Sequence, residues 1–397
     1  MASRSSVFST RSGWSSVLAG ASLFAVGALV GGILAGRPKK STILPSPRTT
    51  RLRLSDEERS QLPYPPDVLP GARDVDTPYG SIRIYEFGPE DGRKVLLVHG
   101  ISTPAIALGG VAHGLVDTGC RVMLFDLFGR GYSDNPADLP QDIRLFTTQI
   151  LLALASSPLP WTGKGSGKFS MIGYSLGGGI STTFTSYFPD LVDTLILFTP
   201  AGLLRPYHIS KTSRVIYSEG IIPEPILLRL VKKRLQRPLS APAKPGDGQN
   251  HQVDATEAVQ AEVNLESNSQ AVLSKIRPHV TVEATVDDQL NSHPGFVPAF
   301  MSSIRYAPIQ HQHDRWRMVG DQLSQANKEN GTRKKVLIVC GATDPIIITK
   351  ELEEDATAVL SGNAEIVVLD AGHEVPITKV DEVVAHIVDF WKRTDSQ

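Results

Sequence analysis

A serine between two glycines, in the segment 172–179 (IGYSLGGG), is the first candidate for chemistry in this chain. The pattern Gly173-x-Ser175-x-Gly177 follows a strand-like run and precedes a helix-compatible run. In that context it is typical of a nucleophile elbow, a tight turn that leaves no room for a Cβ at either glycine. Ser175 is then expected at the carboxyl edge of a sheet, near a helix amino terminus that favours an oxyanion.

A nucleophilic serine needs a general base, and the base needs a carboxylate that orients it. Both residue types follow strand-like runs near the end of the chain. Asp344 lies in GATDP (341–345), and His373 lies in GHEVP (372–376). Residues that follow parallel strands meet at one edge of an open sheet, where such folds place their sites. The order serine, aspartate, histidine is the one that nucleophile-elbow proteins use.

The elements that must position these residues alternate along the chain from about residue 80. Short apolar runs bounded by turn residues predict buried parallel strands, and helical stretches separate them. The alternation predicts the α/β class, with a doubly wound and mostly parallel sheet. Strands are predicted at 81–87, 95–98, 121–125, 169–173, 194–198, 335–340 and 364–369, and helices at 142–156, 176–187, 350–360 and 380–391.

The alternation stops between residues 203 and 332, which predicts a helical cap inserted into an α/β core (80–202 and 333–397). The cap contains the basic amphipathic segment 226–235 (ILLRLVKKRL). We interpret it as a cap helix with a solvated basic face, in preference to a helix that contacts a membrane surface. The polar segment 237–270 predicts a disordered insertion.

The amino-terminal part of the chain predicts a membrane anchor. Residues 14–36 carry no charge, and a helix of that length, about 35 Å, crosses a bilayer core of roughly 30 Å. Basic residues in the tail 1–13, and more of them in the linker and entry segment 37–79, place the carboxy-terminal domain in the cytosol or the mitochondrial matrix. The Ser- and Arg-rich start also fits a mitochondrial presequence.

The formal charge of −1 over 397 residues hides an asymmetry. Eight of the 40 basic residues and none of the 41 acidic residues precede Asp56, so the rest of the chain has a charge of −9. This balance gives no reason to expect a nucleic-acid partner. Cys120 and Cys340 border strand-like runs and predict buried thiols. His311-x-His313 lacks a third ligand, so no metal site is expected there.

Four motifs together make residues 80–393 resemble the alpha/beta hydrolase superfamily. The motifs are VHGIS (98–102), FDLFGRGYSD (125–134), GYSLGG (173–178) and the pair GATDP and AGHEVP. The resemblance implies Ser175 as the nucleophile, His373 as the base and Asp344 as its partner. It also implies an oxyanion hole built from the backbone N–H groups of Ile101 and Leu176, and it implies no cofactor.

Three polar residues near these motifs are expected to shape loops instead of reacting: His99, Asp126 and Arg130. A serine nucleophile disfavours the epoxide and haloalkane chemistry that related enzymes carry out with an aspartate. We therefore predict a serine hydrolase that cleaves a carboxylic ester. The anchor favours a lipophilic substrate, lipid- or monoacylglycerol-like, and small membrane-anchored monoacylglycerol lipases are similar in layout.

Alternatives remain open at this stage. A carbon–carbon bond hydrolase or an acyltransferase would use the same triad. A non-catalytic ligand-binding or scaffold protein is the alternative of another class. The sequence does not predict the oligomeric state.

Overall fold

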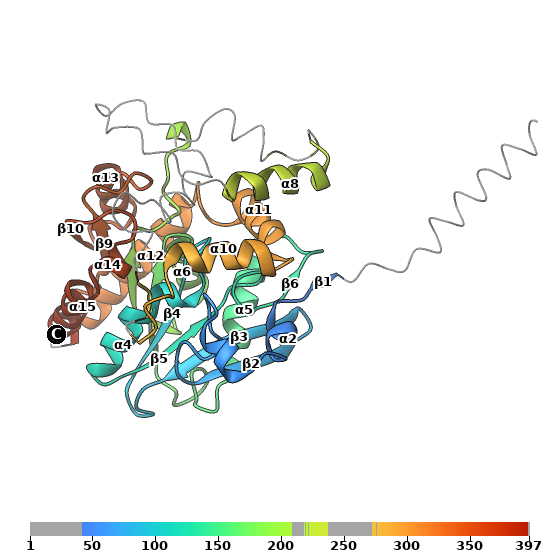
Figure 1. The fold of residues 1–397 in the computed structure, drawn as a ribbon. Helices are drawn as coiled ribbons and strands as arrows, with labels where there is room; N and C mark the ends of the chain where they lie inside the picture. Colours follow the sequence, from blue (N-terminus) through green and yellow to red (C-terminus); the bar gives the residue numbers. More distant parts are fainter. Residues whose placement is uncertain are drawn as a thin grey trace, which may run out of the picture. The chain divides into compact units, whose positions relative to one another are not determined.

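A sheet of eight strands forms the centre of the fold (Figure 1). The strands are β2 (Ala72–Thr77), β3 (Gly80–Phe87), β4 (Arg93–Val98), β5 (Cys120–Phe125), β7 (Phe169–Tyr174), β8 (Val192–Phe198), β9 (Val336–Gly341) and β10 (Ala364–Leu369). Their order across the sheet is β10-β9-β8-β7-β4-β5-β3-β2. All neighbours from β10 to β5 are parallel, whereas β3 and β2 are added antiparallel at one edge. This mostly parallel sheet confirms the predicted fold class.

The computed structural model describes residues 42–208, 218, 220, 222–236, 272–274 and 276–395. The predicted anchor 14–36 and the predicted insertion 237–270 lie outside the described residues. Within the described ranges, no helix has the length and apolar character needed to cross a membrane.

The edges of the sheet differ from the sequence prediction. The sequence of β2, ARDVDT, contains a single strongly apolar residue, Val75, and it alternates exposed and half-buried positions, so no apolar run marks it as a strand. β3 is buried as predicted but antiparallel to β5. β10 was expected to be fully buried, yet it is an edge strand and the Val368 side chain is 47% exposed.

Helices cover both faces of the sheet, as a doubly wound fold requires. The side chains of β4 show why, because alternate residues point to opposite faces. Leu96 and Val98 belong to one buried cluster, and Val95 and Leu97 belong to the other. The first cluster includes residues of α5 (Ile143–Ala155) and α6 (Leu176–Tyr187), and the second includes residues of α4 (Gly109–Asp117) and α15 (Val380–Asp395).

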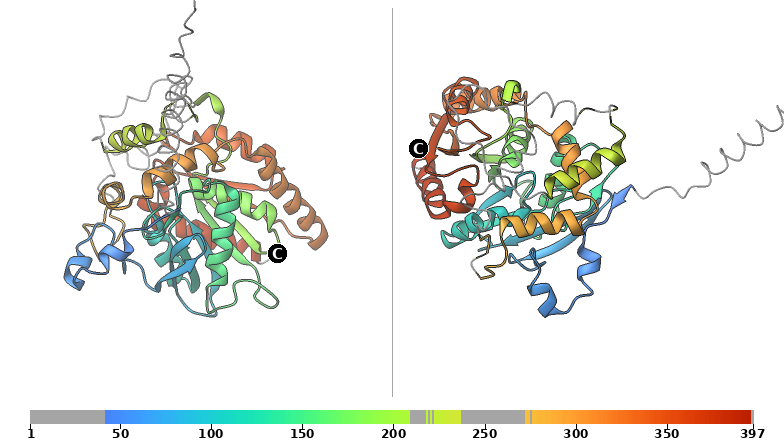
Figure 2. Two further views of the ribbon diagram at one scale, coloured as in Figure 1. Left: turned by 90° about the vertical axis from the view of Figure 1, so that its right-hand side faces the viewer. Right: turned by 45° about the horizontal axis from the view of Figure 1, so that its top comes forward.

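The helices between β8 and β9 do not all belong to the cap. The cap consists of α8 (Glu224–Leu235), α10 (Val282–Ser292) and α11 (Phe296–Tyr306), with α8 packed on α11 (Figures 1 and 2). By contrast, α12 (His313–Asn330) packs against α6 and α13 (Thr349–Val359). Its buried residues Trp316 and Val319 are part of the cluster beneath α6, so this helix extends the core layer.

The segment expected to be a linker, 37–79, contributes to the core from residue 43 onward. β1 (Ile43–Leu44) pairs with β6 (Asn135–Pro136). In the short helix that follows, the Arg51 guanidinium is buried between the core and the cap. It donates hydrogen bonds to Asp288 Oδ1 (2.5 Å) and Ser292 Oγ (2.8 Å) of α10 and to the Tyr132 hydroxyl (3.2 Å).

The Arg51→Ala substitution is expected to lower the free energy of unfolding by about 3 kcal/mol, because it leaves the Asp288 carboxylate, whose side chain is only 13% exposed, without its cation. Arg59→Ala is the matched control, since the Arg59–Asp56 pair is at the surface and such pairs contribute about 1 kcal/mol or less. Urea unfolding of both variants measures the difference. Equal losses in the two variants would contradict this role of Arg51.

Candidate active site

The structure brings Ser175, His373 and Asp344 together at the carboxyl edge of the sheet. His373 Nε2 lies 2.9 Å from Ser175 Oγ, and His373 Nδ1 lies 2.8 Å from Asp344 Oδ2. The histidine and aspartate side chains are buried, whereas Ser175 is partly exposed. An ionised carboxylate only accepts hydrogen bonds, so Nδ1 carries the proton and Nε2 is left to accept the serine hydroxyl. This is the geometry that a serine needs in order to be activated as a nucleophile.

Ser175 occupies the turn between β7 and α6 with φ 51° and ψ −117°. Residues other than glycine rarely adopt a positive φ, and residues held in that conformation commonly belong to functional sites. The two flanking glycines make the turn possible. A Cβ at Gly173 would collide with the Gly177 carbonyl, and a Cβ at Gly177 would collide with the carbonyls of Val98 and His99. The glycine pattern in the sequence therefore has the steric cause that the nucleophile-elbow prediction assumed.

Asp344 and His373 are positioned by the turns that follow β9 and β10. Asp344 Oδ1 accepts hydrogen bonds from the backbone N–H groups of Ile346 (2.8 Å) and Ile347 (2.9 Å), which leaves Oδ2 for the histidine. The His373 ring lies 5.5 Å from the ring of Tyr174, the residue before the serine. These contacts fix both side chains in the orientation that the serine requires.

The loop after β4 carries Ile101, one of the two predicted oxyanion-hole residues, and Leu176 begins α6. The close approach of Gly177 to Val98 and His99 holds the start of α6 against this loop. His99 accepts a hydrogen bond at Nε2 from the Leu127 N–H (2.8 Å), so its protonated Nδ1 donates to the Gly100 carbonyl (2.8 Å). That carbonyl belongs to the same peptide group as the Ile101 N–H, so the His99 ring orients the predicted donor.

Two further buried polar residues hold the same region in place. Arg130 Nε donates to the Ile101 carbonyl (3.1 Å), and its NH2 donates to Ser303 Oγ in α11 (2.7 Å). Asp126 accepts hydrogen bonds from the backbone N–H groups of Ala105 and Tyr132 (both 2.9 Å). Burial raises the pKa of Asp126 to about 6. Both residues brace loops, as expected from the sequence, and Arg130 also joins its loop to the cap helix α11.

A residue that the sequence analysis missed, Gln289 of α10, joins the cap to this loop. Its amide donates to the Ser102 carbonyl (2.9 Å) and accepts from the Gly131 N–H (2.8 Å). The side chain is 1% exposed. A lone glutamine in a poorly periodic cap segment carries no sequence signal, and only the packing of α10 on the core shows its position.

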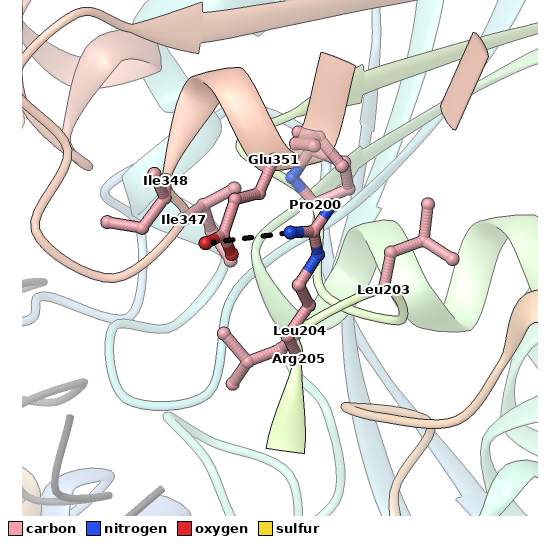
Figure 3. A pocket seen from close by; sticks show the side chains of 8 residues that line it. Pro200, Leu203, Leu204, Arg205, Ile347, Ile348 and Glu351 are labelled. Carbon is pink, nitrogen blue, oxygen red and sulfur yellow. Dashed lines mark ion pairs between the residues drawn. The ribbon is translucent and has the colours of Figure 1, made fainter. Parts of the chain in front are cut away.

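A small cavity of about 20 Å³ lies beside the turn that carries Asp344 (Figure 3). Leu203 and Ile347 are among its lining residues, and the Arg205–Glu351 ion pair (3.8 Å) crosses it. The volume suits roughly one water molecule, which is far below the size of a ligand pocket. The ion pair instead links the segment that enters the cap to α13.

The remaining candidates are not part of this site. Within the described residues, no group of three or more His, Cys, Asp or Glu side chains is placed to hold a metal ion. His311 is exposed and outside any such group. Cys120 and Cys340 are buried free thiols, which confirms that prediction.

Comparison with known proteins gives the family to which this architecture corresponds. Residues 95–386 match the model of the alpha/beta hydrolase family. An uncharacterised protein of Mycobacterium tuberculosis is 31% identical over 144 residues, which are 36% of this chain and 39% of that protein. A serine hydrolase-like protein of Danio rerio is 26% identical over 128 residues, which are 32% of this chain and 37% of that protein. The chain thus spans about two fifths of the length of these relatives.

Among solved structures, a bacterial membrane phospholipase A described as a virulence factor has a TM-score of 0.54 and 16% identity. The match covers 96% of this chain and 99% of that chain. At this identity the likeness concerns the fold.

Buried histidines predict how the stability of the protein depends on pH. Burial lowers the pKa of His99 to about 3, and that of His293 in the cap to about 4. The unfolded chain, with ordinary histidine pKa values near 6.5, binds more protons than the folded chain below that pH. The stabilisation is therefore complete above pH 6.5 and is lost as the pH falls, by about 1 kcal/mol per histidine between pH 6.5 and 5.5.

The His99→Asn variant isolates the contribution of one histidine. Between pH 6.5 and pH 5.5, the free energy of unfolding of this variant, measured with urea, is expected to decrease by about 1 kcal/mol less than that of the wild type. Asp126 acts with the opposite sign, because its raised pKa makes the protein lose stability as the pH rises from about 4 to 6. That contribution is common to both proteins and cancels in the comparison. Parallel pH profiles of variant and wild type would refute the assignment.

Proposed function

The chain belongs to the alpha/beta hydrolase family, and from this premise we propose that it is a serine hydrolase that cleaves a lipophilic carboxylic ester. Family membership and the fold support a hydrolase role. The serine mechanism and the ester substrate are our proposal. One observation carries it, the continuous hydrogen-bonded chain from Ser175 Oγ through His373 to Asp344.

In the proposed acylation step, Ser175 Oγ attacks the ester carbonyl carbon and its proton moves to His373 Nε2. The Asp344 carboxylate stabilises the imidazolium that forms. The backbone N–H groups of Leu176 and Ile101 stabilise the negative charge on the carbonyl oxygen, an effect worth several kcal/mol in enzymes of this type. His373 then gives the proton to the leaving alkoxide, the alcohol departs, and an acyl-serine remains.

In the deacylation step, a water molecule attacks the acyl-serine and His373 takes its proton. The tetrahedral intermediate collapses with return of the proton to Ser175 Oγ, and the carboxylic acid is released. Apart from the ester and the attacking water, all the groups in this cycle come from the chain itself, so the proposed mechanism invokes no cofactor.

The substrate class follows from the sequence outside the described residues. An uncharged segment at 14–36, long enough to span a bilayer, supports a membrane-anchored enzyme. Long-chain esters and monoacylglycerols partition into the same bilayer. We therefore propose a lipid-like ester substrate, a single-pass attachment and a catalytic domain on the cytosolic or matrix side.

The Ser175→Ala variant is expected to lose activity by a factor on the order of 10⁴ or more, because neither a nucleophile nor an acyl-enzyme can form. A fluorophosphonate probe should label the wild type and fail to label this variant. Ser181→Ala, in the helix that follows Ser175, is the matched control, since among the described residues Ser181 Oγ has no hydrogen-bond partner to lose. Turnover is followed on p-nitrophenyl esters of increasing chain length and on monoacylglycerols.

The outcomes of this experiment separate the alternatives. Wild-type turnover in Ser175→Ala would refute the serine mechanism. Labelling of Ser175 without ester turnover would indicate a carbon–carbon bond hydrolase or an acyltransferase. Absence of labelling would support a non-catalytic ligand-binding protein.

Deletion of residues 1–40 is expected to release the protein from membranes washed with high salt, which screens contacts between surface charges, and to preserve turnover of a water-soluble short-chain ester. The deletion removes the predicted anchor and spares β1, which starts at Ile43. Deletion of residues 1–54 is the comparison, because it also removes β1 and Arg51 and should therefore destabilise the fold. Membrane fractionation and ester turnover of both proteins test this proposal. If the protein lacking residues 1–40 stayed on membranes after a high-salt wash, the role of 14–36 would be contradicted.

A further inference from the structure

The cap helix α8 has an outward face that combines aliphatic and basic side chains. Ile226 and Leu230, one turn apart, are 50% and 54% exposed. About 100° further round the helix, Leu227 and Val231 are 0% and 2% exposed and pack into the core cluster beside α11. The helix therefore already has a buried apolar face, and Ile226 and Leu230 form an apolar strip next to it that the cap leaves uncovered.

The cations of α8 surround this strip. Arg229 and Lys233 are exposed on the same side as Ile226 and Leu230, and Lys232 and Arg234 flank them. No acidic residue occurs between 225 and 236. Within the part of the chain that the structure describes, no carboxylate pairs with Arg229, Lys232 or Lys233.

The one acidic residue of α8 does not offset these charges. Glu224 lies at the amino end of the helix, where its carboxylate pairs with Arg305 of α11 at 3.0 Å. The basic residues are concentrated in the last turns. The result is a helix with a positive and partly aliphatic outer face, held at its amino end by Glu224 and just past its carboxyl end by the Gln236–Asn291 hydrogen bond (3.0 Å).

The exposed basic face that the sequence predicted is present in α8, but it also carries Ile226 and Leu230. An ordinary solvated face has charged and polar groups, with single apolar residues scattered among them. Two aliphatic side chains at i and i+4, with cations at i+3 and i+7, are instead typical of helices that lie in a membrane interface. The aliphatic groups enter the headgroup–acyl boundary, and the cations meet the phosphates.

We propose that the outer face of α8 docks on an anionic lipid surface, through Ile226 and Leu230 as apolar contacts and Arg229 and Lys233 as headgroup contacts. The inference deepens the proposed function, on which its biological meaning rests. α8 packs on α11, and α11 receives the hydrogen bond from Arg130 beside the predicted oxyanion loop. Docking of α8 would thus bring the active-site side of the molecule to the lipid surface that contains the substrate.

The test places an environment-sensitive, thiol-reactive fluorophore on the full-length protein at Ile226→Cys. The two native cysteines are buried, 4% and 0% exposed, so an introduced surface thiol is labelled selectively. The protein is reconstituted into vesicles of phosphatidylcholine, alone or with phosphatidylglycerol. The readouts are the emission wavelength and its quenching by lipids brominated in the acyl chain. The control is Asp91→Cys. Asp91 is exposed in the turn before β4, at the amino end of the strand, whereas the active site lies at the carboxyl ends.

With anionic vesicles, the probe at position 226 is expected to shift to shorter wavelength and to be quenched, and the probe at position 91 is not. Adding Arg229→Gln and Lys233→Gln should lower the docking equilibrium constant by about 30-fold. Each cation near an anionic surface contributes about 1 kcal/mol of binding free energy, and about 1.4 kcal/mol corresponds to a factor of ten. A probe that stays in water in both vesicle types would overturn the proposal.

A second result would also overturn it. If the probe at 226 had the same short emission wavelength in neutral and anionic vesicles, independent of Arg229 and Lys233, another protein surface would cover the strip. Candidates are the acidic stretch 247–266 of this chain and a second copy of α8. None of these readouts needs substrate turnover. Fluorophosphonate labelling of Ser175 in the same samples shows separately whether the proposed nucleophile is active, so the two hypotheses can fail independently.

Discussion

The backbone turn at Ser175 is the constraint on which the site depends. A positive φ at a serine costs about 1–3 kcal/mol and persists only where the neighbouring structure enforces it. Here the neighbouring segments supply that restraint. The Ser175 N–H donates to the Phe198 carbonyl of β8 (3.0 Å), and the Ser175 carbonyl accepts from the N–H groups of Gly178 and Ala201 (both 2.9 Å). The turn is therefore clamped between its own helix and the end of the next strand, and the hydroxyl is held above the sheet edge.

The same sheet edge explains why residues 198 positions apart in the chain can meet. Parallel strands all end at one edge, so the turns after β7, β9 and β10 are brought together by strand pairing alone. Strand pairing does not orient side chains, however. The two backbone N–H groups that bind Asp344 Oδ1 orient the aspartate, and the ring contact between Tyr174 and His373 orients the histidine. Sheet topology sets the distances between the turns, and local hydrogen bonds set the orientations.

The parts that could be predicted from sequence are those with local causes. The glycines of the elbow, the apolar strand runs and the turn motifs around Asp344 and His373 each have a steric or periodic reason that is visible in a few residues. β2 could not be predicted, because a half-buried edge strand needs no apolar run and the charged residues of ARDVDT find partners across the surface. The contacts of Gln289 and Arg51 could not be predicted from the sequence either, since they join segments whose proximity depends on the placement of the cap. The cap boundary was wrong at α12 for the same reason.

The two ends of the cap are held by different kinds of interaction, and this difference bears on function. α10 is joined to the core by buried hydrogen bonds from Gln289 and Arg51, which tolerate little displacement because each leaves a polar group unsatisfied when broken. Among the described residues, α8 is held by aliphatic packing of Leu227 and Val231 on α11, by the Glu224–Arg305 ion pair, and by a hydrogen bond from Gln236, just past its end, to Asn291 of α10 (3.0 Å). Aliphatic packing is not directional and permits small shifts without loss of a specific bond. The cap is thus fixed most firmly beside the predicted oxyanion loop and least firmly at the helix with the basic, aliphatic outer face. A lipid surface that engaged α8 would act on the adaptable end of the cap and leave the geometry around Ser175 undisturbed.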